Sequence, residues 1–180
     1  MQLPTAFVAE MKNILGDEFT EFEFALQGDP PISIRYNPKK KPPQLTENQV
    51  LWNQNGTYLP QRPIFTLDPK FHGGAYYVQE ASSMFVGAAA RQLLDVEQPL
   101  KVLDLCAAPG GKSTLLLSIL QEDSLMVSNE VIKSRYHILR ENLTKWGNAN
   151  IYISNHDPDD FAELEGYFDL VLVDAPCSGE

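Results

Sequence analysis

The stretch Leu103–Thr114, which reads LDLCAAPGGKST, decides the fold of the larger part of this chain. Apolar residues lead into it and Pro-Gly-Gly interrupts it, so we interpret it as the end of a buried strand, a tight turn and the start of a helix. A helix that begins after such a turn directs backbone N–H groups and the positive end of its dipole towards one point. The stretch therefore predicts a loop that can bind an anionic group.

The pattern on both sides of this stretch alternates between strands and helices. The expected strands are 100–105, 125–129, 151–154 and 169–174, and the expected helices are 79–94, 113–121, 132–147 and 158–165. Strands that alternate with helices indicate a parallel sheet covered on both faces. The expected fold class is therefore α/β, with an incomplete Rossmann-like domain over residues 73–180.

The first 72 residues have a different pattern, which predicts a small mixed α/β domain. Helices are expected at 4–15 and 46–53, a strand at 32–36, and short strands within 56–67. Gly73-Gly74 breaks the pattern and marks the predicted boundary between the two domains.

Composition excludes several classes of protein. The chain is 43% hydrophobic, but no apolar run approaches the roughly 20 residues of a membrane span, and the start lacks the pattern of a secretory signal. The two cysteines, Cys106 and Cys177, have a spacing that predicts neither a disulfide framework nor a metal site. We expect a cytoplasmic, monomeric protein that binds no metal and no membrane.

The net charge of −10 argues against simple electrostatic binding to nucleic acid. Residues 35–70 are the exception, because they carry six Lys or Arg side chains and two acids. Arg35 and Lys39–Lys41 belong to this segment. It is either a solvated loop or a patch that contacts a nucleic-acid backbone.

Acidic residues follow three strands of the expected sheet, at Glu130, Asp157 and Asp174. Ligands of open parallel sheets bind beyond the carboxyl ends of the strands, so these side chains are informative as a set. Glu130 could accept hydrogen bonds from ribose hydroxyls, or it could be an acid favoured at a helix N-terminus. Asp157 could contact an adenine, or it could cap the helix that begins at Pro158. Together they favour a ligand that contains a nucleoside.

Two kinds of ligand use a loop of this type, namely nucleotide phosphates and the amino-acid end of S-adenosylmethionine. The phosphate-loop pattern G-x-x-x-x-G-K-[ST] would need Gly at position 106, where this chain has Cys106. Pro109 removes one further N–H donor from the loop. Asp174 could still serve a magnesium site, so a nucleotide hydrolase remains an alternative.

Several segments resemble motifs of the Sun/Fmu (NOL/NOP/Sun) family of RNA cytosine-5 methyltransferases. The resemblance rests on Asp104–Lys112 and on Asp174–Gly179, which reads DAPCSG. Tyr77–Ser83 looks like a third family motif, and Arg35–Lys39 is similar to a segment of the family's N-terminal RNA-contacting region. The resemblance covers most of the chain and implies methylation of cytosine C5 in rRNA or tRNA.

The resemblance also implies a cofactor, S-adenosylmethionine, and roles for particular residues. The methionine portion would be held by the loop residues Cys106, Ala107, Ala108, Pro109, Gly110, Gly111 and Lys112. Glu130 would hold the ribose, Asp157 the adenine, and Asp174 would lie between the cofactor and the target base. Asp174 would also assist the addition of a cysteine thiolate to cytosine C6, which makes C5 electron-rich enough to accept the methyl group.

The chain departs from the family pattern in its cysteines. Cys177 matches an accessory cysteine that helps to break the covalent product, whereas the nucleophile lies in a later Thr-Cys-Ser-like motif that these 180 residues do not contain. Cys106 belongs to the cofactor loop and cannot substitute for it. We therefore expect a fragment of a longer enzyme that is inactive alone, and a catalytically silent RNA-binding module is a further alternative.

Overall fold

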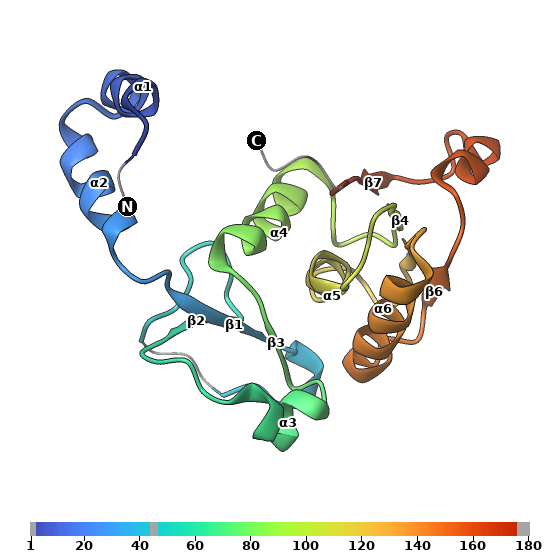
Figure 1. Cartoon of the computed structure of the whole chain (residues 1–180). Helices are drawn as coiled ribbons and strands as arrows, with labels where there is room; N and C mark the ends of the chain where they lie inside the picture. The colour runs from blue at the N-terminus through green and yellow to red at the C-terminus, as the bar shows by residue number, and fades with distance from the viewer. Residues whose placement is uncertain (1–2, 44–46, 176–180) are drawn as a thin grey trace. The chain divides into compact units, whose positions relative to one another are not determined.

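The computed structural model describes residues 3–43 and 47–175, which form two compact units, Met1–Pro31 and Ile32–Glu180. The first unit consists of α1 (Thr5–Leu15), a 3-10 turn η1 (Gly16–Glu18) and α2 (Phe19–Gln27) (Figure 1). Phe22 packs against Phe7 and Phe19, each with 6.3 Å between ring centroids. The predicted helix at 4–15 is confirmed, whereas the sequence analysis did not predict α2.

The second unit begins with an antiparallel sheet of three strands in the order β2-β1-β3. Its strands are β1 (Ile32–Tyr36), β2 (Gly56–Leu59) and β3 (Tyr76–Val78), and its short helices are η2 (Pro38–Lys40), η3 (Phe65–Leu67) and α3 (Pro69–His72). Ile34 of β1 lies opposite Val78 of β3, and it forms a small core with Phe65 and Tyr76.

The helix predicted at 46–53 is wrong for residues 47–53, which form a turn against β2. The backbone N–H of Val50 donates to the carbonyl of Gly56 at 2.9 Å, and that of Tyr58 donates to Asn48 at 2.7 Å. Asn48 has a positive φ of 55°, which asparagine tolerates better than most residues. Val50 is the buried side chain of this turn, whereas Leu51 is 94% exposed.

The second sheet has four parallel strands in the order β6-β5-β4-β7. Its strands are β4 (Lys101–Asp104), β5 (Leu125–Asn129), β6 (Ile151–Ser154) and β7 (Leu170–Leu172). The helical segments around it are α4 (Ala81–Leu93), α5 (Gly111–Leu117), α6 (Lys133–Trp146) and the 3-10 helix η4 (Pro158–Leu164). The predicted α/β fold with a parallel sheet is confirmed.

The order of the strands fixes where a ligand can bind. The chain passes from β4 to β5 and β6 on one side, and then returns to place β7 on the other side of β4. This reversal at β4 is a topological switch point, and a crevice forms there beyond the carboxyl ends of the strands. The loop after β4 begins at that crevice.

The core beneath this loop is apolar and fully covered. Val102, Leu116, Met126 and Leu139 each have no exposed surface. α4 lies close to α5, since a Cβ added to Gly87 would lie 3.1 Å from Leu115 Cδ1. Among the described residues, no helix has the length and apolar content needed to cross a membrane.

Both sheets belong to the same compact unit. The domain boundary expected near residue 72 stays a prediction.

Candidate functional site

The loop between β4 and α5 (residues 105–110) has the strand–turn–helix form that the sequence predicted. Gly110 has a φ of +106°, a region that favours glycine, and a Cβ added there would lie 3.3 Å from Leu139 Cδ1. The loop is tied to the next strand, because the backbone N–H of Ala107 donates to the carbonyl of Asn129 at 2.7 Å. α5 begins at Gly111, two residues earlier than expected.

A cavity of about 210 Å³, here called the loop cavity, brings three predicted motif segments together. Its lining residues are Tyr77, Val78, Gln79, Glu80, Ser83, Asp104, Cys106, Ala107, Ala108, Pro109, Gly111, Lys112 and Asp174. All predicted loop residues except Gly110 line it, as does Asp174. Glu130 and Asp157 are not among the lining residues.

The charge of the loop cavity is mainly negative. Glu80, Asp104 and Asp174 line it, and among the described residues they face a single cation, Lys112, whose Nζ forms an ion pair with Asp174 Oδ2. This arrangement differs from a phosphate cradle, which needs donors and cations. The cavity therefore favours a ligand that carries positive charge.

Asp104 belongs to the stretch that predicted the loop, but the sequence assigned it no role. Its environment in the structure is unusual. Its Oδ2 accepts a hydrogen bond from Ser113 Oγ at 2.7 Å, and only 1% of the residue is exposed. Oδ1 accepts no hydrogen bond of good geometry from the described residues. Burial raises the pKa of Asp104 to about 6, although Ser113, Lys112 and the backbone N–H of Cys106 all favour the charged form.

Cys106 lies in the loop as a half-buried thiol. Burial raises its pKa, and the neighbouring charges of Glu130 and Asp104 raise it further. Because only a thiolate is a strong nucleophile, this environment disfavours a nucleophilic role for Cys106. Cys177, the other cysteine, lies outside the described residues.

Glu130 lies directly after β5 with only 2% of its surface exposed. Its Oε1 accepts a hydrogen bond from the backbone N–H of Ile132 at 2.9 Å. Its Oε2 lies 3.7 Å from Arg135 Nη1 and accepts no hydrogen bond from the described residues. Arg135 Nη2 donates to the carbonyl of Ala108 at 2.7 Å, so this arginine connects Glu130 to the loop. The sequence analysis missed Arg135, because its role depends on neighbours that only the fold brings together.

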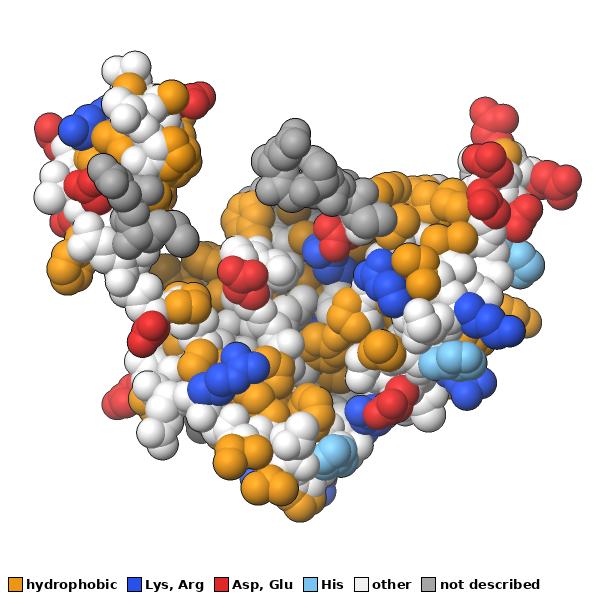
Figure 2. All heavy atoms as spheres, viewed as in Figure 1, with side chains coloured by type: hydrophobic (Ala, Val, Ile, Leu, Met, Phe, Trp, Pro, Cys, Tyr) orange, Lys and Arg blue, Asp and Glu red, His pale blue; other side chains and the backbone are white. Residues whose placement is uncertain are grey.

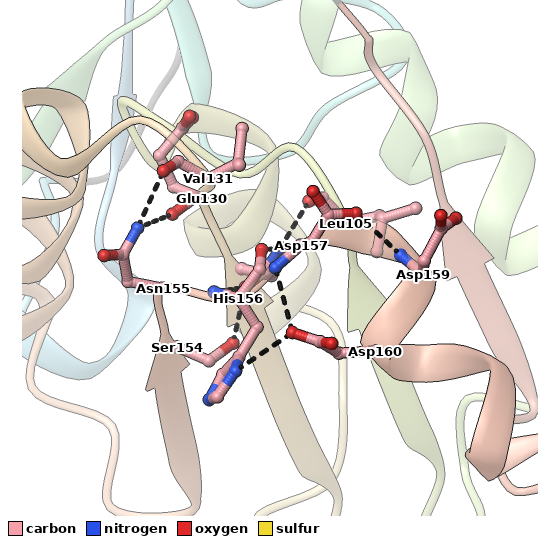
Figure 3. A network of polar contacts seen from close by, with 10 residues as sticks. Leu105, Glu130, Val131, Ser154, Asn155, His156, Asp157, Asp159 and Asp160 are labelled. Atoms are coloured by element: carbon pink, nitrogen blue, oxygen red, sulfur yellow. Dashed lines mark hydrogen bonds and ion pairs between the residues drawn. The ribbon is translucent and has the colours of Figure 1, made fainter.

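A network of amide side chains holds the ends of β5 and β6 together (Figure 3). Asn155 Nδ2 donates to the carbonyls of Glu130 and Val131, at 2.6 and 2.9 Å. Asn129, fully buried, accepts the backbone N–H of His156 at 3.0 Å and donates to the carbonyl of Leu105 at 3.3 Å. The network fixes the position of the backbone at Glu130.

Asp157 caps η4, which is one of the two roles expected for it. Its Oδ1 accepts the backbone N–H of Asp159 at 3.1 Å, and Asp160 Oδ2 accepts the backbone N–H of Asp157 at 3.2 Å (Figure 3). The two residues form a capping box around Pro158. Its contact with an adenine stays a prediction.

Arg35, expected in an RNA-contacting segment, is fully buried and contacts α5 instead. Its guanidinium donates to Gln79 Oε1 at 2.7 Å, to Thr114 Oγ1 at 2.7 Å and to the carbonyl of Gly111 at 3.2 Å. It also stacks on Trp146, with Cζ 4.6 Å from the ring centroid. For Arg35, both interpretations of this segment, a solvated loop and a patch that contacts a nucleic-acid backbone, are therefore wrong, because none of its surface is exposed.

Neighbouring residues of that segment also form contacts within the chain. Asn37 is fully buried, and its Nδ2 donates to the carbonyl of Trp146 at 2.8 Å. Lys39 pairs with Glu122 at 3.0 Å, and Lys40 Nζ donates to the carbonyls of Gly73 and Lys145. Lys39 and Lys40 make these contacts at the surface and stay exposed, so Arg35 is the only cation of the described stretch that is removed from the free positive surface.

Comparison with known proteins assigns the chain to a family. Residues 3–81 match the family described as the N-terminal domain of 16S rRNA methyltransferase RsmF. Residues 91–180 match the family described as 16S rRNA methyltransferase RsmB/F. The chain belongs to the 16S rRNA methyltransferase RsmB/F family. The predicted resemblance is thereby confirmed.

Relatives of this RsmB/F family member include enzymes named ribosomal RNA small subunit methyltransferase F. The protein from Erwinia tasmaniensis is 33% identical over 98% of this chain and 40% of its own length. The Vibrio cholerae protein is 34% identical over 100% of this chain and 41% of its own length. The chain thus spans about two fifths of the length of these relatives.

Solved structures support the same fold for this RsmB/F family member. A methyltransferase homologue from Pyrococcus horikoshii has a TM-score of 0.73 at 26% identity, over 98% of this chain and 65% of that one. NSun6 from Pyrococcus horikoshii has a TM-score of 0.69 at 16% identity, over 97% of this chain and 71% of that one. The Rossmann-like methyltransferase fold expected from the sequence is confirmed.

Among the described residues, no group of three or more His, Cys, Asp or Glu side chains could hold a metal ion.

Proposed function

We propose that this chain binds S-adenosylmethionine in the loop cavity and belongs to an enzyme that methylates cytosine C5 in ribosomal RNA. The observation that carries the proposal is the charge of the cavity. S-adenosylmethionine carries two cationic groups, an ammonium and a sulfonium. Three carboxylates, those of Glu80, Asp104 and Asp174, line the described part of the cavity against Lys112 alone.

The buried carboxylate of Glu130 supports the same ligand. Its Oε2 has an unused hydrogen-bond capacity, as far as the described residues go, in a residue that is only 2% exposed. A buried acceptor whose partner is only a 3.7 Å ion pair with Arg135 lacks a hydrogen bond, and a ribose hydroxyl would supply one. Arg135 Nη1 lies 3.7 Å from this oxygen and holds the carboxylate beside the loop, where it can accept hydrogen bonds from hydroxyl groups.

A nucleotide hydrolase is disfavoured by the same charges. A triphosphate would bring several negative charges against the three carboxylates, and like charges at short range repel strongly. The loop also lacks the first glycine of a phosphate cradle, since position 106 is Cys106.

The proposed chemistry uses a cysteine thiolate that adds to C6 of the target cytosine, while an acid at N3 takes up the developing negative charge. C5 then receives the methyl group that the cofactor supplies. A base removes the C5 proton, the cysteine leaves C6 as a thiolate, and the proton on N3 returns to the acid, which completes the reaction. We assign Asp174 to N3, because it lines the loop cavity and remains 57% exposed at its side chain. Cys177 is proposed to assist release of the product.

The nucleophile is proposed to lie in a motif beyond these residues, because Cys106 has a raised pKa and Cys177 matches the accessory position. We therefore propose that the 180-residue chain binds cofactor without transferring methyl groups. Transfer of a labelled methyl group to RNA by this chain, abolished by Cys177→Ser, would overturn that assignment.

Calorimetry tests the proposed ligand. Titration of the chain with S-adenosylhomocysteine should show binding, and titration with ATP and Mg²⁺ should not. Glu130→Gln keeps the size of the side chain but removes its charge, so we expect about tenfold weaker binding of S-adenosylhomocysteine. Glu163→Gln, a change of the same type on exposed η4, is the matched control and should leave the affinity unchanged. Binding of ATP with Mg²⁺ in place of S-adenosylhomocysteine would contradict the proposal.

A further inference from the structure

A second cavity, of about 320 Å³, adjoins the loop cavity and has no role in the function proposed above. We call it the aromatic cavity. Its lining residues are Arg62, Phe65, Thr66, Phe71, Gly74, Tyr76, Tyr77, Val78, Asn142, Lys145 and Trp146. It lies where α3 and β3 approach α6, and Figure 2 shows hydrophobic side chains gathered over this part of the face with Lys and Arg side chains among them.

Five of the eleven lining residues are aromatic, and three of their rings pack against one another. Phe71 lies 6.3 Å from Phe65 and 6.0 Å from Tyr76 between ring centroids. Tyr76 is anchored further, because its hydroxyl donates to Asp68 Oδ2 at 2.8 Å. Trp146 is only 2% exposed and is fixed by the stacked guanidinium of Arg35. Phe65, Tyr76 and Trp146 are buried and support the two half-buried rings, Phe71 and Tyr77. These two rings form a rigid apolar surface that needs little ordering when a flat ligand binds.

Two cations lie above these rings. Arg62 Cζ is 5.7 Å from the ring centroid of Phe65, and Lys145 Nζ is 5.4 Å from that of Phe71. Lys145 also pairs with Glu141 at 2.7 Å, whereas Arg62 has no ion pair among the described residues. Within the described part of the chain, no acid lines the cavity, although the whole sequence carries 24 acids against 14 Lys and Arg. The lining of the aromatic cavity thus carries two cations, of which Lys145 is paired with Glu141 outside the lining, whereas the loop cavity beside it is acidic.

The two cavities share a wall. Tyr77 and Val78 line both of them. The Tyr77 ring lies against the start of α5, since a Cβ added to Gly111 would lie 3.3 Å from Tyr77 Cε1. Asn142 of the aromatic cavity donates from Nδ2 to the carbonyl of Pro109 at 2.8 Å. A ligand in the aromatic cavity would therefore lie one residue's thickness from the cofactor loop.

We propose that the aromatic cavity binds an unstacked nucleobase of single-stranded RNA, with Arg62 and Lys145 contacting the flanking phosphates. Proteins read single-stranded RNA by stacking splayed bases on aromatic rings, and cations beside those rings bind the backbone. The two cations favour this occupant over an apolar peptide segment, because such a segment carries no negative charge that could pair with Arg62. The inference rests on the proposed function and adds to it a second contact point for the RNA substrate.

Fluorescence anisotropy with a labelled single-stranded 12-nucleotide RNA of mixed sequence tests the proposal. Phe71→Leu removes one ring but keeps an apolar side chain, and we expect about tenfold weaker binding. Phe85→Leu is its control, because Phe85 is an exposed ring on α4 that packs against Trp52. Arg62→Gln should weaken binding severalfold and reduce its salt dependence by about one phosphate contact, whereas Arg91→Gln on α4 should do neither.

Folding and the proposed function are checked in parallel. Arg62 is exposed, so Arg62→Gln keeps the test valid if Phe71→Leu is poorly folded. Calorimetry should give the same affinity for S-adenosylhomocysteine in all four variants; if the wild-type chain binds RNA through this cavity but not S-adenosylhomocysteine, the proposed function alone fails. Undetectable RNA binding, or equal RNA affinity in wild type, Phe71→Leu and Arg62→Gln, would overturn the inference. Binding of an apolar peptide at the cavity without RNA binding would overturn it in favour of a protein partner.

Discussion

At the scale of single residues, Arg35 is a charged side chain with a structural role. It is fully buried without a carboxylate partner among the described residues, and its donors bind carbonyl, amide and hydroxyl oxygens of β3–α4 and α5. Burial lowers the pKa of Arg35 to about 9, which is still far enough above neutral pH to keep the side chain charged. Arg35 therefore connects the antiparallel sheet to α5, the helix that follows the loop after β4.

Replacing Arg35 should destabilise the chain strongly. Arg35→Met leaves the carbonyl of Thr114 and the side-chain oxygen of Gln79 without this donor in the interior, so we expect a loss of about 3 kcal/mol in the free energy of unfolding. Arg35→Lys keeps the charge but lacks the planar fork, so its loss should be smaller but still measurable. Urea unfolding measures both, and a midpoint for Arg35→Met equal to that of wild type would contradict this role.

Asp104 predicts a pH dependence of stability. Its pKa is about 6 in the folded chain, against 3.8 for an unperturbed aspartate, so folding favours the protonated form. Its contribution is most favourable below pH 4 and is lost as the pH rises through 6, by about 3 kcal/mol in total. Asp104→Asn removes this titration. The difference in unfolding free energy between Asp104→Asn and wild type should therefore grow in favour of the variant from pH 4 to pH 7, and a constant difference would contradict the prediction.

At the scale of secondary-structure elements, the parallel sheet was predictable and the antiparallel sheet only in part, since β1 coincides with the predicted strand 32–36 and β2 lies within 56–67. β5 and β6 coincide with the predicted 125–129 and 151–154, because both strands begin with a run of three apolar or aromatic residues. β3 has only three residues, and its place is fixed by pairing with distant β1. At residues 47–53 the positive φ of Asn48 produces a turn where the sequence predicted a helix.

The contact between α6 and the turn before β3 depends on Gly74. It has a φ of +65°, and a Cβ added there would lie 2.2 Å from the carbonyl oxygen of Lys145. Gly166 is a matched control, with a φ of +71° and no atom of the described residues within 4 Å of an added Cβ. Gly166→Ala should cost about 1–2 kcal/mol for backbone strain alone. Gly74→Ala should cost clearly more in thermal or urea unfolding, and equal losses would show that the close approach contributes nothing.

At the scale of the whole molecule, the net charge does not describe the charge of each site. The net charge of −10 argued against an RNA-binding role, yet the described lining of the aromatic cavity has two cations and no acid. Part of the site was visible in the sequence, because the loop and Asp174 belong to contiguous motifs. Arg135 and the aromatic cavity were not, since their members come from segments separated by up to about eighty residues that only the fold brings together.

The division into two compact units gives the last prediction. All residues that line the loop cavity and the aromatic cavity belong to the unit that begins at Ile32. Removing residues 1–28 deletes α1 and α2 while leaving three residues before β1. Calorimetry should then give an affinity for S-adenosylhomocysteine within about twofold of that of the full chain, because every proposed contact is retained. A loss of tenfold or more, in a shortened chain that still unfolds cooperatively, would show that the first unit takes part in cofactor binding.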